Sequence, residues 1–287
     1  MKRGKGTPFR VLSMVKVPRD ILWQKMEKDL QECCENSGVV GYHLLDLVSG
    51  LRTGFQDDIL FPTASTIKIA ILLAVADKVY RGHLSWDERH STTNLPKVGG
   101  SGILSHLRYA VDLALWDICA LMISLSDNDA TNLCIELTGF DYVNGLMDSL
   151  GLPNTRLRRK MMDAEAVKRG DENTSTPREL VTLIEKIYKR DGIAEPVARD
   201  VLTLLELPKS GPFTDALPHS VQRANKPGGL SHVSVDAGVV YLQDRPFCLS
   251  VMGSFLEPQD DEPVKRVIQK AYKYMDLIAR CTEYGRA

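Results

Sequence analysis

The spacing of apolar residues predicts helices along much of the chain and strands in two separate blocks. Residues 18–36 carry an apolar stripe at helical spacing, which predicts an amphipathic helix. Val39–Leu47 and Leu51–Phe55 have strand character on either side of a Ser-Gly turn, so they predict a hairpin. From Phe61 to Ala76 the chain is apolar on nearly every side, which is typical of a helix buried in a large core.

The middle of the chain, residues 83–205, is helical and rich in loops. A long polar loop runs between Pro153 and Pro177, and loops of this length in compact domains tend to be functional. The helices predicted here are Leu113–Ile123, Ala130–Leu137, Val143–Leu150, one that begins at Pro177, and Val197–Leu205.

After Pro208 the apolar period changes to two, which predicts three further strands before a helix that begins at Pro263. These strands are Ser220–Lys226, Val233–Leu242 and Phe247–Phe255. Because helix and hairpin at one end must meet strands and helix at the other, we predict an α/β (α+β) fold. Its antiparallel sheet, flanked by the N- and C-terminal helices, comprises residues 1–58 and 206–287. Residues 59–205 form an inserted all-helical lobe, and a cleft between lobes is a preferred place for a site.

Composition excludes several classes of partner. The chain has 36 basic and 37 acidic residues and a net charge of −1, so nothing indicates a nucleic-acid partner. The longest apolar run is interrupted by Lys68 and is too short to span a bilayer. Cysteines and histidines show no metal-ligand spacing, and we expect no metal or organic cofactor. Cys119, Cys134 and Cys248 lie in apolar runs, which suits free buried thiols.

The first residues bear on the compartment. Met1–Gly6 is basic, as at the start of a signal peptide, but no apolar stretch of signal length follows it. As written, the chain is expected to be soluble and kept in a reducing compartment. A periplasmic or secreted location would require a leader that has been removed.

Two polar residues interrupt the apolar helix that follows Phe61. Ser65 and Lys68 stand three residues apart and therefore project from one face, with Thr63 as the predicted N-cap. A charged lysine is costly to bury, so chemistry is the simplest reason to keep it. The pattern Ser-x-x-Lys is weak by itself. A second copy, Ser13–Lys16, lies in a basic stretch without a helical pattern and is interpreted as chance.

Two further motifs follow in the chain. Ser126-Asp127-Asn128 would, alone, be a polar turn between helices, and Lys226-Pro227-Gly228-Gly229 would be a turn after a strand. Ordered Ser-x-x-Lys, Ser-Asp-Asn and Lys-Thr-Gly motifs are the signature of class A β-lactamases and penicillin-binding proteins. The chain therefore resembles the class A β-lactamase family of active-site serine hydrolases. The resemblance covers nearly the whole chain and implies a sheet domain joined to an all-helical domain.

The resemblance implies catalytic roles for four residues. Ser65 would be the nucleophile, and Lys68 would take its proton if burial and the nearby Lys226 cation keep the Lys68 amine neutral. Ser126 would relay the proton towards the leaving nitrogen. Lys226 would attract a substrate carboxylate and polarise Ser126.

Substrate binding is implied for three more residues. Asn128 would hydrogen-bond a substrate amide, and Gly228 and Gly229 would border the bound substrate. The backbone N–H groups of Ser65 and Gly229 would form the oxyanion hole.

Two departures from the family pattern affect the predicted chemistry. Pro227 stands where the family usually has threonine or serine, so one hydroxyl for a substrate carboxylate is absent. The long loop also lacks the Glu-x-x-Leu-Asn motif whose glutamate activates the deacylating water. An alignment without gaps puts Lys160 at that place. Asp163 and Glu165 are nearby carboxylates, and Glu165 is the possible deacylation base, although both suit solvated loop positions as well.

Three functional hypotheses follow. The first is a serine hydrolase of class A β-lactamase type, which opens the β-lactam amide through an acyl-Ser65 intermediate. The second is a penicillin-binding peptidase or esterase-like relative that acylates but deacylates β-lactams slowly. The third is a catalytically silent binding module. The expected partner is a small amide or ester.

Two smaller points are that Cys119 has no cysteine in the Ser65 helix to pair with, and that His232 could border the site.

Overall fold

The computed structural model describes residues 17–35, 37–95 and 97–287, so the second Ser-x-x-Lys copy at Ser13–Lys16 lies outside the described residues. The helices are α1 (Pro18–Cys34), α2 (Lys68–Tyr80), α3 (Leu115–Ser124), α4 (Asn128–Thr138), α5 (Phe140–Ser149), α6 (Ala164–Lys168), α7 (Pro177–Lys189), α8 (Glu195–Leu205), α9 (Pro212–Ala216) and α10 (Glu262–Arg280). The strands are β1 (Val39–Asp46), β2 (Arg52–Phe55), β3 (Phe61–Pro62), β4 (Arg89–Ser91), β5 (Asp112–Ala114), β6 (Thr174–Ser175), β7 (Gln222–Leu230), β8 (Val233–Tyr241) and β9 (Phe247–Ser254).

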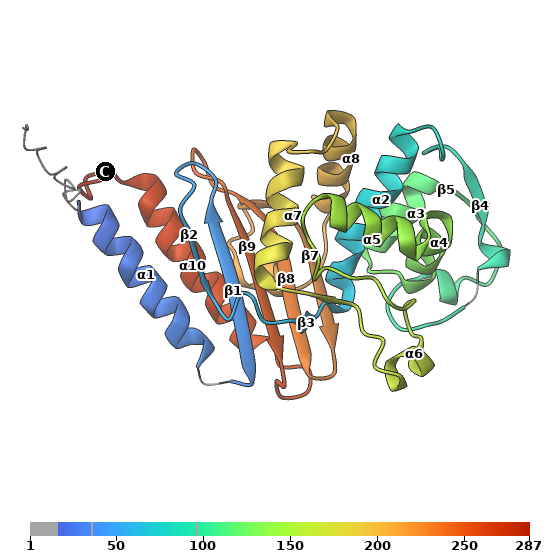
Figure 1. Ribbon diagram of the computed structural model, residues 1–287, viewed down its shortest axis with the longest axis horizontal. Helices are drawn as coiled ribbons and strands as arrows, with labels where there is room; N and C mark the ends of the chain where they lie inside the picture. Colours follow the sequence, from blue (N-terminus) through green and yellow to red (C-terminus); the bar gives the residue numbers. More distant parts are fainter. Residues whose placement is uncertain (1–16, 36, 96) are drawn as a thin grey trace, which may run out of the picture.

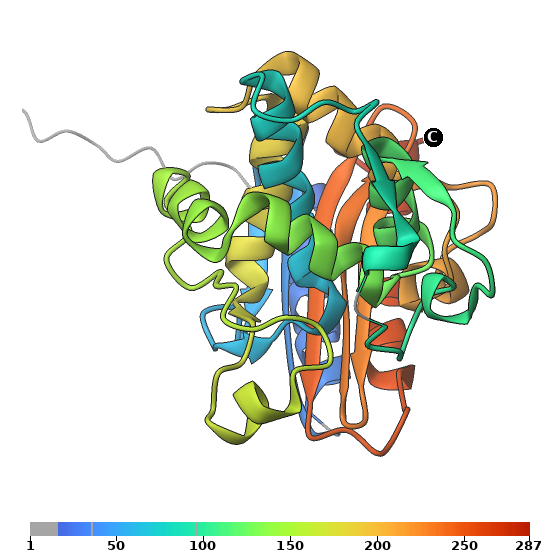
Figure 2. The ribbon, with the colours of Figure 1, turned by 90° about the vertical axis from the view of Figure 1, so that its right-hand side faces the viewer.

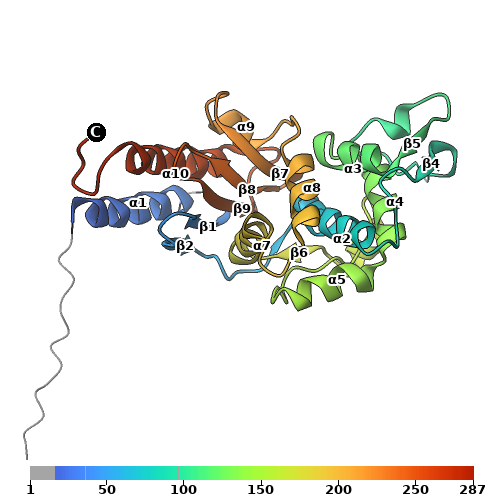
Figure 3. The ribbon, with the colours of Figure 1, turned by 90° about the horizontal axis from the view of Figure 1, so that it is seen from above.

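Five strands form one antiparallel sheet in the order β2-β1-β9-β8-β7. The first strand, β1, pairs with the last, β9, which brings the two ends of the sequence into one layer, as predicted. Figure 1 shows α1 and α10 side by side along one face of this sheet, and Figure 3 shows the same pair from above. β7 is the edge strand on the side of the helical lobe.

Two hydrophobic cores hold the layers together. One joins α1 and α10 to one sheet face, with Met26, Leu249 and Met275 fully buried among its members. The other joins the opposite sheet face to α2 and the helices around it, and Ile71, Leu180 and Val235 are fully buried there. Because every side of α2 meets protein, its uninterrupted apolar sequence is explained. Figure 2 shows α2 behind the surrounding helices of this lobe.

The lobe boundaries at residues 58 and 206 stay a prediction. One helix of the segment predicted as the helical lobe, α7, packs on β1, β8 and β9 of the sheet. Its N-terminus is fixed by Pro177 in the first turn and by the Thr176 hydroxyl, which accepts the N–H of Glu179 at 3.1 Å. The long loop before it carries the short helix α6, which lies away from the core of the molecule (Figure 1).

Candidate active site

Ser65 lies in a 3₁₀ turn, Ala64–Ile67, that runs directly into α2. The helical segment begins directly after Thr63, as predicted, but its first turn is 3₁₀ and the predicted side-chain cap from Thr63 was wrong. The Thr63 hydroxyl does not cap the turn but donates to the backbone oxygen of Asn173 at 3.1 Å. Ala64 adopts a left-handed backbone with φ +46°, which residues with a Cβ rarely do. Such strain persists only where the surroundings fix the backbone, and it is common at functional sites.

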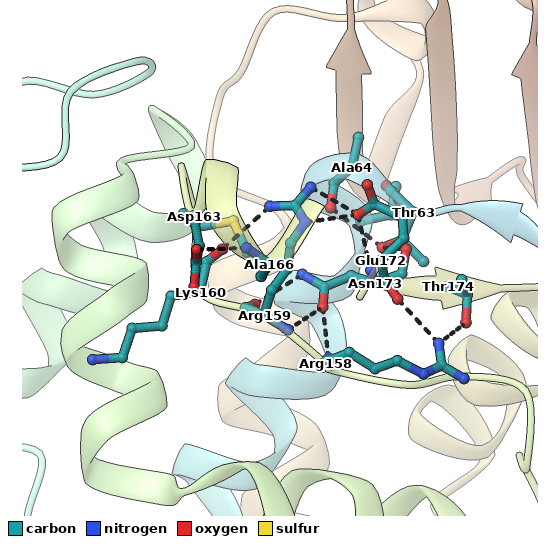
Figure 4. A network of polar contacts seen from close by, with 12 residues as sticks. Thr63, Ala64, Arg158, Arg159, Lys160, Asp163, Ala166, Glu172, Asn173 and Thr174 are labelled. Atoms are coloured by element: carbon teal, nitrogen blue, oxygen red, sulfur yellow. Dashed lines mark hydrogen bonds and ion pairs between the residues drawn. The ribbon is translucent and has the colours of Figure 1, made fainter. Parts of the chain in front are cut away.

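The surroundings that fix this turn come from the end of the long loop (Figure 4). The backbone N–H of Thr63 donates to the oxygen of Asn173 at 2.9 Å. The buried Asn173 side chain accepts the N–H groups of Arg158 (2.7 Å) and Arg159 (3.0 Å) and donates to the Arg159 oxygen (3.1 Å). An ion pair of 2.7 Å between Arg159 and Glu172 closes the loop. The loop therefore holds the serine turn in place.

Lys68 is fully buried at the start of α2. Its Nζ contacts the backbone oxygen of Ser126 at 2.8 Å, the Ser126 Oγ at 3.0 Å and the Asn128 Oδ1 at 3.1 Å. Burial first, and then repulsion from Lys226, hold the pKa of Lys68 well below its ordinary value. The expected effect of burial and the second cation on Lys68 is thus confirmed.

Ser126 sits in the turn between α3 and α4 with a left-handed backbone, φ +54°. Asp127 holds this turn: its buried carboxylate caps α4 by accepting the Ala130 N–H at 3.0 Å. The same carboxylate accepts the N–H groups of Ile103 (2.7 Å) and Leu104 (2.9 Å) from the preceding loop. Asp127 had no predicted role, although an Asp directly before a helix is a recognisable N-cap signal in a sequence.

Lys226 approaches the same hydroxyl from the sheet. Its Nζ lies 3.1 Å from the Ser126 Oγ and 2.9 Å from the backbone oxygen of Pro227. Burial lowers the pKa of Lys226 to about 7. Two buried amines from different lobes therefore converge on one serine oxygen. When both amines donate to that oxygen, both of its lone pairs are used, which leaves its proton free to point elsewhere.

Asn128 is engaged through both ends of its side chain. Its Oδ1 contacts Lys68, and its Nδ2 donates to the backbone oxygen of Gly99 at 3.0 Å. Each group keeps a further hydrogen-bonding capacity, because the oxygen has two lone pairs and the amide two protons. The predicted contact of Asn128 with a substrate amide stays a prediction.

The strand predicted as Ser220–Lys226 extends further than expected, through Pro227-Gly228-Gly229. β7 continues through these residues to Leu230, in register with β8. An edge strand tolerates proline because its outer side needs no donor. The Pro227 carbonyl points to that outer side, since it accepts from Lys226. Alternation along the strand then directs the Gly229 N–H to the same free edge.

Gly228 lies directly against the serine turn. An added Cβ would be only 2.7 Å from the Ser65 nitrogen and 2.9 Å from the Thr63 oxygen. The absence of a side chain at Gly228 thus permits the edge of β7 to meet the backbone of Ser65. This approach brings the two predicted oxyanion-hole residues, Ser65 and Gly229, to neighbouring elements.

A cleft of about 710 Å³ opens between these elements. Ser65, Ser126 and Lys226 line it together with Gly228 and Gly229, while Lys68 lies buried behind them. The cleft is also lined by Asp215, Asp260 and Asp261 and by Ser210 and Ser234. Lys226 is the cation among the described residues that line it.

The loop carboxylates considered for deacylation do not line this cleft. The Glu165 side chain is 73% exposed on α6 and forms an ion pair with Lys168 at 2.8 Å. Asp163 caps α6 by accepting the N–H of Ala166 at 2.9 Å. Lys160 pairs with Glu136 of α4 at 2.6 Å. The role of Glu165 as a base stays a prediction, without support from its position.

The loop segment that is hydrogen-bonded to α4 carries apolar side chains and not a carboxylate. Met161 is buried, and its backbone N–H and oxygen contact the Asn132 side chain at 2.8 and 3.2 Å. The Met162 sulfur lies near Gly100, 2.9 Å from where a Cβ there would be. His232 is exposed, and its Nδ1 lies 2.8 Å from the Leu256 oxygen. His232 is not among the residues that line the cleft.

Comparison with known proteins places this geometry in a family. A model of the β-lactamase enzyme family matches residues 25–275. The chain belongs to this family. β-Lactamase L2 of Stenotrophomonas maltophilia is 30% identical over 157 residues, or 52% of this chain and 50% of L2. The chain thus spans about half the length of the curated relatives it matches.

Solved structures agree along most of the chain. A β-lactamase from Sphaerobacter thermophilus matches with a TM-score of 0.81 and 27% identity, over 89% of this chain and 98% of that one. A structure of PBP-A matches with a TM-score of 0.78 and 25% identity, over 87% and 95% respectively. The predicted serine β-lactamase fold is therefore confirmed for this member of the β-lactamase enzyme family.

Two other features are absent from the residues that the structure describes. No helix there is long and apolar enough to cross a membrane. Within the same residues, no three His, Cys, Asp or Glu side chains are grouped so that they could hold a metal ion.

Proposed function

We propose that the protein is a serine hydrolase of class A β-lactamase type, which opens a β-lactam amide through an acyl-Ser65 intermediate. The observation that carries the proposal is the convergence of Lys68 and Lys226 on the Ser126 hydroxyl, beside the Ser65 turn and the cleft. A polar turn or a solvated surface would not need two buried amines at one oxygen. Family membership supports activity on β-lactams.

Acylation begins with the Ser65 hydroxyl. A neutral Lys68 has two N–H groups, which suit the two oxygens that only accept, the Ser126 carbonyl and the Asn128 Oδ1. Its lone pair is then left for a hydroxyl proton. The Ser65 Oγ attacks the substrate carbonyl while its proton passes to the Lys68 Nζ, and the lowered pKa of Lys68 favours the neutral form that this step needs.

Ring opening requires a proton on the leaving nitrogen. Lys226 donates to the Ser126 Oγ, and Lys68 can do so as well once it carries the Ser65 proton, so the Ser126 proton is then free for the cleft. As the C–N bond breaks, that proton moves to the nitrogen, and Lys68 returns the Ser65 proton to Ser126 across their 3.0 Å contact. Charge on the carbonyl oxygen is met by the backbone N–H groups of Ser65 and Gly229.

Lys226 is the group proposed to attract the substrate carboxylate. Pro227 supplies no hydroxyl for this purpose. Ser210 and Ser234 line the same cleft and offer hydroxyls in place of the missing one. Because the pKa of Lys226 is about 7, its attraction for an anion weakens as the pH rises through neutrality.

Steady-state hydrolysis of a chromogenic cephalosporin tests the proposal. Wild-type protein is expected to turn over, and Ser65→Ala is expected to lose the activity while keeping its thermal transition. Equal activity of the two proteins would refute the role of Ser65. If no β-lactam or ester labels Ser65 at all, the silent binding module becomes the better description.

A second function, a penicillin-binding peptidase or esterase-like relative, is favoured by one specific observation. The loop presents Met161 and Met162 near α4 and Gly100, while Glu165 is exposed and paired with Lys168. A deacylating water would then lack a carboxylate base from this loop. Among the similar structures is one of a PBP-A mutant as an acyl-enzyme complex with penicillin G.

Pre-steady-state kinetics separate the two functions. A rapid burst equal to the enzyme concentration, followed by little turnover, indicates the peptidase-like function. Continued turnover without a limiting burst indicates the β-lactamase function. Both results require acylation of Ser65, so they differ only in the fate of the acyl group.

A further inference from the structure

The cysteine pair Cys119 and Cys134 lies immediately behind the site. Cys119 is on α3 and Cys134 on α4, and both are completely buried. Their sulfur atoms are 3.8 Å apart. Both thiols are free. Ser126 lies in the turn that connects α3 to α4, and α4 begins at Asn128.

A bond between these sulfurs needs little movement. A disulfide has an S–S length of about 2.05 Å, so the two sulfurs must approach by roughly 1.7 Å. Rotation of the two side chains and a small shift of α3 against α4 supply this distance. The other cysteines are placed differently: Cys248 is buried on β9, and Cys281 follows the end of α10.

We propose that Cys119 and Cys134 form a disulfide when the chain folds in the presence of a small disulfide oxidant, and that this bond fastens α3 to α4 across the Ser126 turn. The bond closes a ring that contains the whole turn and both adjoining helix segments. Fixing a ring of about 15 residues restricts the unfolded chain and therefore stabilises the folded one. The predicted lack of a cysteine partner for Cys119 in α2 is unaffected, because the partner lies on α4.

The chemistry is two thiol–disulfide exchanges. With oxidised glutathione, one cysteine thiolate attacks the glutathione disulfide, forms a mixed disulfide and releases one glutathione thiolate. The second cysteine thiolate attacks the protein sulfur of the mixed disulfide and releases the other glutathione. In sum, two protein thiols are oxidised to one disulfide, and one oxidised glutathione is reduced to two thiols, which take up the two protons.

The packing decides when this reaction occurs. The hydrogen bond to Cys134, and then burial, hold the pKa of Cys119 well above its ordinary value. The thiolate is the reacting form, and the folded interior also excludes glutathione. The folded, reduced protein should therefore resist oxidation, while a chain that folds in a glutathione buffer should close the bond before the core is complete.

The test uses the full chain, refolded either with reduced glutathione alone or with a mixture of reduced and oxidised glutathione. The products are alkylated and digested without reduction, and the peptides are mapped by mass spectrometry. We expect a cross-linked peptide that joins Cys119 to Cys134 only after refolding with the oxidant. Thermal unfolding of that product is expected roughly 5–10 °C above the reduced form.

Three variants keep the result interpretable. Cys33→Ser/Cys281→Ser retains the pair and should give the same cross-link and the same shift. Cys119→Ser and Cys134→Ser should each lose both, whatever the oxidant. Free thiols at both positions after oxidative refolding, a cross-link to another cysteine, or a disulfide that lowers the melting temperature would overturn the proposal.

Discussion

Gly228→Ala examines the contact between β7 and the serine turn. The added methyl would lie 2.7 Å from the Ser65 nitrogen, 2.9 Å from the Thr63 oxygen and 3.1 Å from the Ala64 Cβ. The first two contacts are with backbone atoms, and loop hydrogen bonds from Asn173 hold this backbone in place. The neighbours cannot evade the methyl by a side-chain rotation.

The size of the expected effect follows from the distances. Ordinary contact begins near 3.4 Å, so the serine turn and β7 must separate by about 0.7 Å. A misplacement of about 1 Å costs roughly 100-fold in rate, and loss of an oxyanion donor costs about 10²–10³. We therefore expect the acylation rate constant to fall about 100-fold. Overpacking of this kind also costs about 1–3 kcal/mol of stability, which leaves a folded protein.

The assay is stopped-flow acylation by a penicillin, with circular dichroism to verify folding. Gly229→Ala is the comparison on the same strand, since its methyl would meet nothing nearer than the Val233 oxygen at 3.8 Å. The fall in the acylation rate constant of Gly229→Ala should be at least tenfold smaller than that of Gly228→Ala. Gly145→Ala on α5, where a methyl meets nothing within 4 Å, controls for the substitution itself. The reasoning would be refuted if Gly228→Ala were acylated as fast as the wild-type protein, or if the acylation rate constant fell equally in the two strand variants.

Three further predictions concern charge. Lys226→Ala should slow acylation by a carboxylate-bearing penicillin about 100-fold, and acylation by a neutral ester much less. In stopped-flow pH profiles, the rate at which the penicillin acylates the wild-type protein should fall as the pH rises through about 7. Glu165→Gln should leave steady-state turnover unchanged, because the side chain is exposed, and a stalled acyl-enzyme would instead establish it as the base. Burial lowers the pKa of His43, so the folded state binds fewer protons than the unfolded state. Wild-type melting temperature should therefore rise more steeply than that of His43→Asn as pH increases towards about 6.5, and parallel profiles would contradict this.

The sequence predicted the main elements because their apolar periods are strong. The hairpin, α1, α7, α8, β8, β9 and α10 all lie within a few residues of their predicted ranges. The order of the motifs also predicted which residues meet: Lys68, Ser126 and Lys226 come from three separate segments and converge on one oxygen.

Local backbone detail could not be predicted in the same way. The 3₁₀ turn at Ser65 and the left-handed Ala64 depend on hydrogen bonds from Asn173, 110 residues away from Thr63. Pro227 and two glycines indicated a turn, yet pairing with β8 extends the strand through them. Tertiary context prevails over turn preference at such an edge.

The sequence allowed solvated positions for Asp163 and Glu165, but it could not assign a separate contact to each carboxylate of the loop. The sequence of a polar loop does not show which of its carboxylates cap a helix, form ion pairs or face solvent, because this depends on the folded loop. Here Asp163 caps α6, and Glu172 closes the loop with Arg159. Glu165 remains at the surface with Lys168.

Time-resolved mass spectrometry of the protein with a penicillin tests the central claim most directly. Samples quenched at successive times and digested should show one penicilloyl group on the peptide that contains Ser65. The group should be present before product is released, whether it then persists or is hydrolysed, and it should be absent from Ser65→Ala. Wild-type protein that stays unmodified while the penicillin is consumed, or an adduct on another residue, would contradict the account.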